Sequence, residues 1–495
     1  MEDNNMKRGL KSRHISMIAI GGAIGTGLFV ATASVISQAG PGGAILAYIL
    51  IGIMLYFLMS SIGELATFYP VSGSFSSYST RFVDPSLGFT MGWLYWGMWS
   101  LVTSVDIIVA SNVLQFWDVF KVLSPLAWSL IFLTFIFLIN IFSVKAFGET
   151  EFWLSLIKVI TIIVFIIVGI LMIFGILGGH SYGFDNYTKG QAPFVGGISG
   201  LLSVLLVAGF SVGGTEVVAV TAGESNNPQK SMPKAIKQVF WRILLFYVLS
   251  IAVIAAIIPY TDPLLLNEHK SVSQSPFTIV FDRIGIAFAA SVINAVILTS
   301  LLSAANSGIY TTSRMLFSLS ADGQAPKFFG KLNKQTKLPM RALVTTYILI
   351  ILVIIYANFN ANAVFNLLNI IGSMVIVVWG SSIWSQIRLR RAIKRQGKNP
   401  DELLPYKAPF YPVGPIIVII TLLFLLLGNS YSSIITGDLL SVLRNFAPII
   451  ILSIIYFVHK LIKRTHFVKL EEMDLTPHNL SLIHISEPTR RRGIS

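Results

Sequence analysis

The chain has 495 residues and a formal net charge of +14, and 54% of its residues are hydrophobic whereas only 12% are charged. Soluble proteins carry roughly a quarter charged residues, so a water-exposed fold could not cover this much apolar surface. The sequence contains no cysteine, which excludes disulfides, thiolate metal sites and cysteine nucleophiles.

Long apolar runs recur along the chain, each close to the roughly 20 residues that cross a hydrocarbon core. We predict twelve spans, near residues 15–38, 43–69, 87–115, 125–145, 152–177, 198–222, 240–259, 277–307, 342–357, 363–387, 412–429 and 445–462. The charged start, MEDNNMKRGLKSRH, does not have the pattern of a removable signal peptide. We therefore expect an all-α membrane domain over residues 15–462, an N-terminal tail of residues 1–14 and a C-terminal tail of residues 463–480.

The excess of basic residues has a topological explanation. If both termini face the cytoplasm, most Lys and Arg fall in inner segments, as the positive-inside rule requires. The linker RLRRAIKRQGK (residues 388–398) and residues 327–341 supply much of this excess. We interpret them as topology signals that touch anionic membrane lipid, and we expect no nucleic-acid partner. The last stretch, SLIHISEPTRRRGIS (residues 481–495), differs in composition and is interpreted as a non-native tail.

Two spans concentrate glycine and small polar residues at their centres. The first contains GGAIGTGLF (residues 21–29), and the sixth contains GFSVGGTE (residues 209–216). Glycine weakens a helix, although close helix packing through small residues would explain either span taken alone. Two five-helix repeats followed by two extra helices would place these segments at equivalent positions, which is the sequence sign of a transporter's binding site. We therefore predict two discontinuous helices around a cavity.

A helix broken inside the membrane attracts an anion with its freed N–H groups and a cation with its freed carbonyls. A free amino acid carries both charges. We predict that the substrate carboxylate binds the amides near Gly25, Thr26 and Gly27, with the Thr26 hydroxyl as an extra donor. The substrate ammonium would meet carbonyls around Ala23, Phe210, Ser211 and Gly213. The spacing G-x-x-G-x-G is not interpreted as a dinucleotide site, because no strand precedes it.

Ionisable residues within the spans are few, and a charge at the bilayer centre costs about 2.5 to 3.5 kcal/mol even on the lower scales. Asp106 and Glu216 could each accept a cationic side chain. Asp106 could instead make an internal polar contact, Glu216 could stabilise the second break, and either carboxyl group could carry a proton. Glu64 is predicted to be a gate or a packing contact rather than a ligand.

Lys158 lies within the fifth span, in SLIKVITIIVF. A fixed ammonium there could satisfy carbonyls that a cation-coupled carrier offers to sodium, so Lys158 favours proton coupling, with Glu216 as a second coupling residue. Alternatively, the Lys158 side chain could extend to the cytoplasmic edge. Phe210, beside the second break, could close over the ligand and offer a cation-π face, or it could be an ordinary core or lipid-facing phenylalanine.

The sequence resembles the amino acid-polyamine-organocation superfamily, and within it the bacterial amino acid transporters that carry lysine. The resemblance extends over residues 10–474 and includes LKSRHISMIAIGGAIGTGLFVATASVISQAGPGGA, GELATFYPVSGSFSSY, GFSVGGTEVVAVTAGESNNPQKSMPKAIKQVFWRILLFY and NAVILTSLLSAANSGIYTTSRMLFSLSADGQAPKFF. It implies a LeuT-type fold of twelve helices with two inverted repeats, and proton-coupled uptake by alternating access.

By the same resemblance, Thr26 and Gly27 match the carboxylate-binding turn, Phe210 the aromatic gate, Glu216 the acidic residue after the second break and Lys158 the ammonium at the sodium-like site. Asp106 resembles the aspartate of the lysine carriers. The chain reads SVGGTE where those carriers tend to read SFQGTE, so Val212 and Gly213 remove bulk near the pocket. Histidine and arginine therefore stay open as substrates.

A second hypothesis is an amino acid sensor that signals through a partner, although no added output segment is visible. A carrier could also hold a regulatory partner in the membrane. An enzyme has no support, because the seven histidines are scattered and no metal-ligand cluster, phosphate loop or activated nucleophile is present in the sequence. We expect no cofactor. The predicted partners are the amino acid, protons and membrane lipid.

Overall fold

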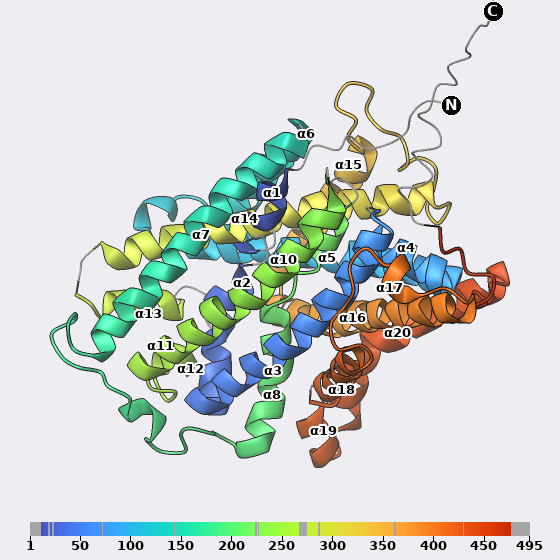
Figure 1. The fold of residues 1–495 in the computed structure, drawn as a ribbon. Coiled ribbons are helices and arrows are strands. Elements are labelled where there is room, and N and C mark those ends of the chain that lie inside the picture. Colours follow the sequence, from blue (N-terminus) through green and yellow to red (C-terminus); the bar gives the residue numbers. More distant parts are fainter. Residues whose placement is uncertain are drawn as a thin grey trace, which may run out of the picture.

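The computed structural model describes residues 11–476, apart from 18–19, 22–23, 72, 143, 223–224, 226, 267–274, 286–287, 361–362 and 429. Ala23, residues 1–10 of the predicted N-terminal tail, residues 477–480 of the predicted C-terminal tail and the stretch 481–495 lie outside the described residues. Helices provide nearly all the regular structure of the described part (Figure 1). The chain is therefore an all-α protein, as its composition and hydropathy predicted.

Eleven helices of 15 or more residues build the described bundle: α3 (Thr32–Phe68), α5 (Pro85–Leu114), α6 (Pro125–Phe142), α7 (Val144–Ile173), α8 (Gly197–Ser211), α10 (Pro228–Arg242), α14 (Ala289–Ala321), α15 (Met340–Asn358), α16 (Ala363–Arg395), α18 (Val413–Gly428) and α20 (Leu439–Lys463). The shorter helices are α1 (Ser12–Met17), α2 (Thr26–Phe29), α4 (Ser74–Phe82), α9 (Val217–Thr221), α11 (Leu249–Ile257), α12 (Pro263–Leu266), α13 (Pro276–Asp282), α17 (Pro400–Leu403) and α19 (Tyr431–Thr436).

Eight helical stretches in the described part are long and apolar enough to cross a membrane, and α8, α18 and residues 125–141 are shorter apolar helices. One of the eight is the continuous stretch of α10, a π-helical segment (Ile243–Val248) and α11. Apolar side chains face outward on the peripheral helices; on α20, for example, Ile451 and Ile454 are each 56% exposed. Such a surface requires lipid. The count of twelve spans and the inverted repeats stay predictions.

The predicted ends of several spans are wrong, among them those of the seventh and the eighth. The eighth span was placed at residues 277–307, but α13 ends at Asp282, a turn with Gly285 at φ +78° follows, and α14 runs from Ala289 to Ala321. The second half of α14 is rich in serine and threonine yet buried, so it faces protein rather than lipid. The seventh span begins earlier than residue 240, because Asn227 caps a helix that starts at Pro228. Hydropathy locates lipid-facing stretches and misses such inward-facing or interfacial ends.

The first two predicted spans also meet without a loop. They join inside α3 at Gly40, which has φ +73° and is followed by Pro41. At the centre of the bundle, α5 packs along α14 and α3 packs along α8 (Figure 1). These four helices, together with α16, surround the two glycine-rich segments.

Candidate functional site

Both glycine-rich segments leave helical geometry. In the first, α1 ends at Met17; of the described residues that precede α2 at Thr26, Ile20 and Gly21 are π-helical, and Ile24 and Gly25 are not helical. The second lies between α8, which ends at Ser211, and α9, which begins at Val217. Backbone donors and acceptors are thereby freed in the middle of the bundle, which is tolerated only where they are buried in protein or line a cavity.

Two glycines explain why the breaks can form and meet. A Cβ atom on Gly27 would lie 2.4 Å from the Ser211 Cα, so the two interruptions touch backbone to backbone. Gly214 has φ +88°, a conformation that other residues rarely adopt. The glycine pattern therefore reflects a close approach and a turn at these positions rather than helix packing alone.

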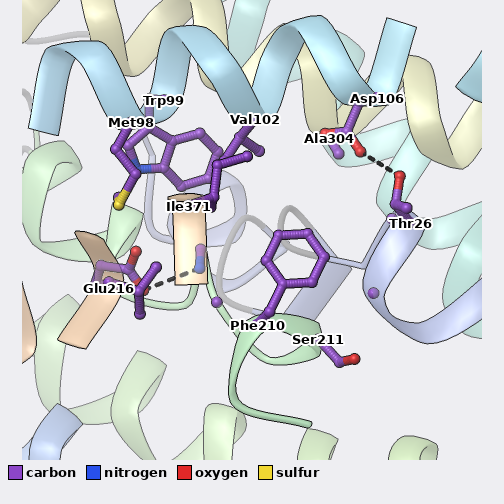
Figure 2. A pocket seen from close by; sticks show the side chains of 15 residues that line it. Thr26, Met98, Trp99, Val102, Asp106, Phe210, Ser211, Glu216, Ala304 and Ile371 are labelled. Carbon is purple, nitrogen blue, oxygen red and sulfur yellow. Dashed lines mark hydrogen bonds between the residues drawn. The ribbon is translucent and has the colours of Figure 1, made fainter. Parts of the chain in front are cut away.

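A cavity lies between the two breaks and α5, α14 and α16 (Figure 2). It brings together eight of the predicted substrate-binding residues: Gly25, Thr26, Gly27, Asp106, Phe210, Ser211, Gly213 and Glu216. The ninth, Ala23, lies outside the described residues, and Lys158 does not line the cavity. The remaining wall is formed by Met98, Trp99, Val102, Gly214, Ala304, Ile371 and Val375.

The side chain of Asp106, on α5, lies beside the start of α2. The Thr26 hydroxyl donates a hydrogen bond to Asp106 Oδ1 across 2.7 Å, and both side chains are buried (Figure 2). A Cβ atom on Gly25 would be 3.5 Å from the same oxygen. The carboxyl group of Asp106 thus occupies part of the place where we expected a substrate carboxylate, and the hydroxyl predicted for the substrate is already engaged.

Glu216 lies at the second break. Its Oε2 accepts a hydrogen bond from the Gly214 N–H at 3.0 Å (Figure 2), so it stabilises the turn, which is one of the three roles considered for this residue. Its Oε1 is buried and accepts no hydrogen bond from any residue that the structure describes. One oxygen of Glu216 therefore supports the backbone while the other stays available to a ligand.

Phe210 stands in the middle of the cavity. Its ring lies between the Thr26–Asp106 end and the end formed by Glu216 and Trp99 (Figure 2). The carbonyl oxygens predicted to bind an ammonium already take part in the fold: that of Phe210 accepts from the Gly213 amide at 2.9 Å, and that of Ser211 accepts from the Tyr247 hydroxyl at 3.0 Å. Each carbonyl has a second lone pair, so these bonds leave room for one more donor.

Lys158 and Glu64 lie outside the cavity. The side chain of Lys158 is 0% exposed, and its Nζ donates to the Gly21 carbonyl oxygen at 2.8 Å, so it does not extend to an aqueous edge. Glu64 on α3 accepts from Arg390 Nε at 2.7 Å, from Gln386 at 3.1 Å and from the Ala408 amide at 2.7 Å. Lys158 is therefore fixed to the first break, whereas Glu64 joins α3 to α16.

Sequence reasoning missed the apolar wall of the cavity and one buried carboxyl group. Met98, Trp99, Val102 and Ile371 read like any residue of an apolar run, so no sequence signal distinguished them. Glu151 is buried in α7, but the fifth span was predicted to begin at residue 152, which left Glu151 in a loop. Its spacing of four residues from Ser155 and seven from Lys158 was the available signal.

Comparison with known proteins identifies the family. The model of the amino acid permease family matches residues 14–472. The chain is 48% identical over 477 residues to the lysine-specific permease of Escherichia coli (strain K12), covering 95% of this chain and 97% of that one. It is 46% identical to the lysine-specific permease of Lactococcus lactis subsp. cremoris (strain MG1363), with 96% and 94% covered. The histidine permease of the same strain is 48% identical, with 96% and 98% covered.

Among solved structures, a mutant manganese transporter of Eremococcus coleocola superposes with a TM-score of 0.53 at 14% sequence identity, covering 91% of this chain and 94% of that one. At this identity the likeness concerns the fold alone, which is LeuT-like. The full-length family match is to permeases, which are not a family of enzymes, and the long apolar helices fit a multi-pass membrane protein. The chain belongs to the amino acid permease family of membrane transporters.

Proposed function

We propose that this protein takes up lysine together with protons across the cytoplasmic membrane of a bacterium, by alternating access. The observation that carries the proposal is the cavity between two interrupted helices, which is lined by two buried carboxyl groups, Asp106 and Glu216. A substrate with two ammonium groups and one carboxylate suits this charge distribution. The names of two full-length relatives, both lysine-specific permeases, support the same substrate.

The two ends of the cavity suggest how lysine binds. Glu216 Oε1 has no donor among the described residues, so we assign it the side-chain ammonium. Met98, Val102 and Ile371 offer apolar contact to the aliphatic stem. The backbone groups of the substrate would lie at the first break. The α-ammonium would lie near Asp106 and the freed carbonyls, and the carboxylate on the amides of Gly25 and Gly27, because Asp106 already holds Thr26.

Proton coupling is proposed from Lys158. The Lys158 ammonium donates a hydrogen bond to the Gly21 carbonyl oxygen. A sodium-coupled carrier could offer such a carbonyl to the metal instead. Proton release from Lys158 would weaken its bond to the Gly21 carbonyl, which also accepts from the Ile24 amide at 3.0 Å, and would so loosen the first break. Glu216 is proposed as a second coupling residue, because a carboxyl group that exchanges a ligand ammonium for a proton links the two movements. The basic residues of 327–341 and 388–398 support an orientation with both termini in the cytoplasm, although residues 388–395, predicted to be a linker, form the end of α16.

Histidine is the alternative substrate, because the histidine permease of Lactococcus lactis is as similar to this chain as the Escherichia coli lysine permease is. Gly213 lines the cavity with no side chain, which leaves space for a ring. An excess of unlabelled amino acids should be tested against radiolabelled lysine uptake in proteoliposomes. We expect lysine to abolish the signal while histidine and arginine leave most of it. Strong competition by histidine, with labelled histidine transported faster than lysine, would contradict the lysine assignment.

A further inference from the structure

Glu151 is a buried carboxyl group that the proposed transport site does not use. Its side chain is 0% exposed, like that of Lys158 on the same helix, α7. The opposite face of α7 carries exposed apolar side chains, including Trp153 at 60% and Ile160 at 52%. Burying an ionisable group is costly unless it is paired, so the position of Glu151 requires an explanation.

Glu151, Ser155 and Lys158 form a polar stripe on one face of α7, because residues four and seven positions apart lie above one another on a helix. The Ser155 hydroxyl donates to Glu151 Oε1 at 3.3 Å. The stripe packs against the first break, since a Cβ atom on Gly21 would overlap the Ser155 side chain at 2.4 Å. One continuous polar face therefore connects Glu151 to the Lys158–Gly21 contact.

Glu151 is held from a second helix as well. The Ser303 hydroxyl of α14 donates to Oε1 at 2.7 Å, and Asn306, one turn further along α14, also interacts with the carboxyl group. The other oxygen, Oε2, is buried and makes no hydrogen bond with any described residue. Two hydroxyl donors on one oxygen stabilise the charged form, and the second oxygen retains capacity for a proton or a water molecule.

The charged groups around the stripe are few. Lys158 attracts both Glu151 and Asp106 of α5, and Arg242 of α10 opposes its charge. A third cation, Arg314 of α14, has its Cζ atom 4.0 Å from the centroid of the Tyr310 ring, and that ring stacks on Phe147 of α7.

The remaining neighbours of α7 contribute no competing charge. On α1, Arg13 and His14 pair with Glu149, whose side chain is 31% exposed. The sequences of α6 and α11 contain no ionisable residue. Among the described residues of α7, Glu151 is therefore the one buried counter-charge of Lys158.

We infer that Glu151 is a positioning residue for proton coupling: it keeps Lys158 charged against the first break and so sets the pH at which Lys158 can release its proton. This inference rests on the proposed proton-coupled function. Seven residues of α-helix span about 10 Å, a separation at which one unit charge in a protein interior shifts the titration of another by about one pH unit.

The test is the pH profile of lysine uptake in proteoliposomes at a fixed pH difference. Glu151→Gln should move the alkaline half-maximal point about one pH unit towards acid, because Lys158 needs a higher proton concentration once its counter-charge is gone. Lysine affinity at the acidic end should stay near the wild-type value. Ser303→Ala weakens only the charged form of Glu151, so it should shift the midpoint in the same direction by less.

Glu149→Gln is the matched control, because it removes a carboxyl group from the same helix at a partly exposed position and should leave the midpoint unchanged. Wild-type midpoints in both Glu151→Gln and Ser303→Ala would overturn the inference, as would an equal shift in Glu149→Gln. If Glu151→Gln does not fold, the pH midpoint of Ser303→Ala is the test, and a wild-type midpoint there would overturn the inference. Wild-type accumulation that survives collapse of the pH gradient would instead refute the proposed proton coupling, before any variant is measured.

Discussion

Two regions of the molecule hold buried carboxyl groups in opposite ways. Beside the basic ends of α16 and α20, Glu64 accepts hydrogen bonds from Arg390 through two nitrogens, from Gln386 and from the Ala408 amide. Asp84 accepts from the Ser86 amide, Lys460, Thr465 and Tyr456. In the cavity, by contrast, Asp106 accepts only from Thr26 among the described side chains, and Glu216 accepts from the Gly214 amide through one oxygen while its other oxygen is buried without a hydrogen bond of good geometry.

This difference distinguishes carboxyl groups that stabilise the fold from carboxyl groups that can bind a substrate. A carboxylate with all its lone pairs engaged contributes to stability and has little to offer a ligand. A buried carboxylate with a vacant oxygen lowers stability until a cation or a proton arrives. Glu64 and Asp84 therefore tie helices together, whereas Asp106 and Glu216 are equipped to bind. Substitutions in the two regions should separate stability from transport.

The largest effect is expected from Glu64→Gln. The change leaves Arg390, which is 12% exposed, without its charge partner, and breaking a buried ion pair costs about 3 to 5 kcal/mol. We expect a clear fall in the Tm of the detergent-solubilised protein. Lysine affinity of the folded fraction should change less than twofold, since Glu64 does not line the cavity. A large loss of affinity at an unchanged Tm would make Glu64 part of the binding site.

Glu216→Gln should have the opposite effect, a large loss of lysine affinity with little change in Tm. Removing a buried partner of a bound ammonium costs about 2 to 4 kcal/mol, which corresponds to at least about a 30-fold loss of lysine affinity. Norleucine, which has a similar stem without the ammonium, should lose little. Competition by both compounds against labelled lysine measures the difference. Equal losses for lysine and norleucine would assign Glu216 to the turn alone.

Asp84→Asn should lower stability by about 1 to 3 kcal/mol, in a pH-dependent way. Burial by itself would raise the pKa of the Asp84 carboxyl group, but hydrogen bonds from Lys460, Ser86 and Thr465 outweigh it and lower the pKa below its usual 3.8. The stabilisation is therefore present above about pH 4 and is lost as the pH falls further. Differences in Tm between wild type and Asp84→Asn should be constant near neutral pH and narrow in strong acid.

The sequence was sufficient for the features that depend on local chemistry. The membrane class follows from apolar runs, and the breaks follow from glycines that a helix would not otherwise concentrate. Asp106, Glu216 and Lys158 were identifiable because an ionisable residue in a span is rare. Features set by tertiary packing were not accessible: Trp99 and Ile371 resemble core residues, and the polar half of α14 does not look like a span. Glu151 was missed because the fifth span was predicted to begin at residue 152, whereas α7 begins at Val144.

The smallest effect is expected from Thr26→Val, which removes the hydroxyl that donates to Asp106 while keeping the shape of the side chain. One such hydrogen bond contributes about 1 kcal/mol, so substrate affinity should fall about fivefold. Because Thr26 lies at the end assigned to the backbone of the amino acid, lysine and norleucine should lose affinity equally, unlike in Glu216→Gln. Thr26→Ser, which restores the hydroxyl, should recover most of the loss. A selective loss for lysine would mean that the side-chain ammonium lies at Asp106, and the two ends of the cavity would have to be exchanged.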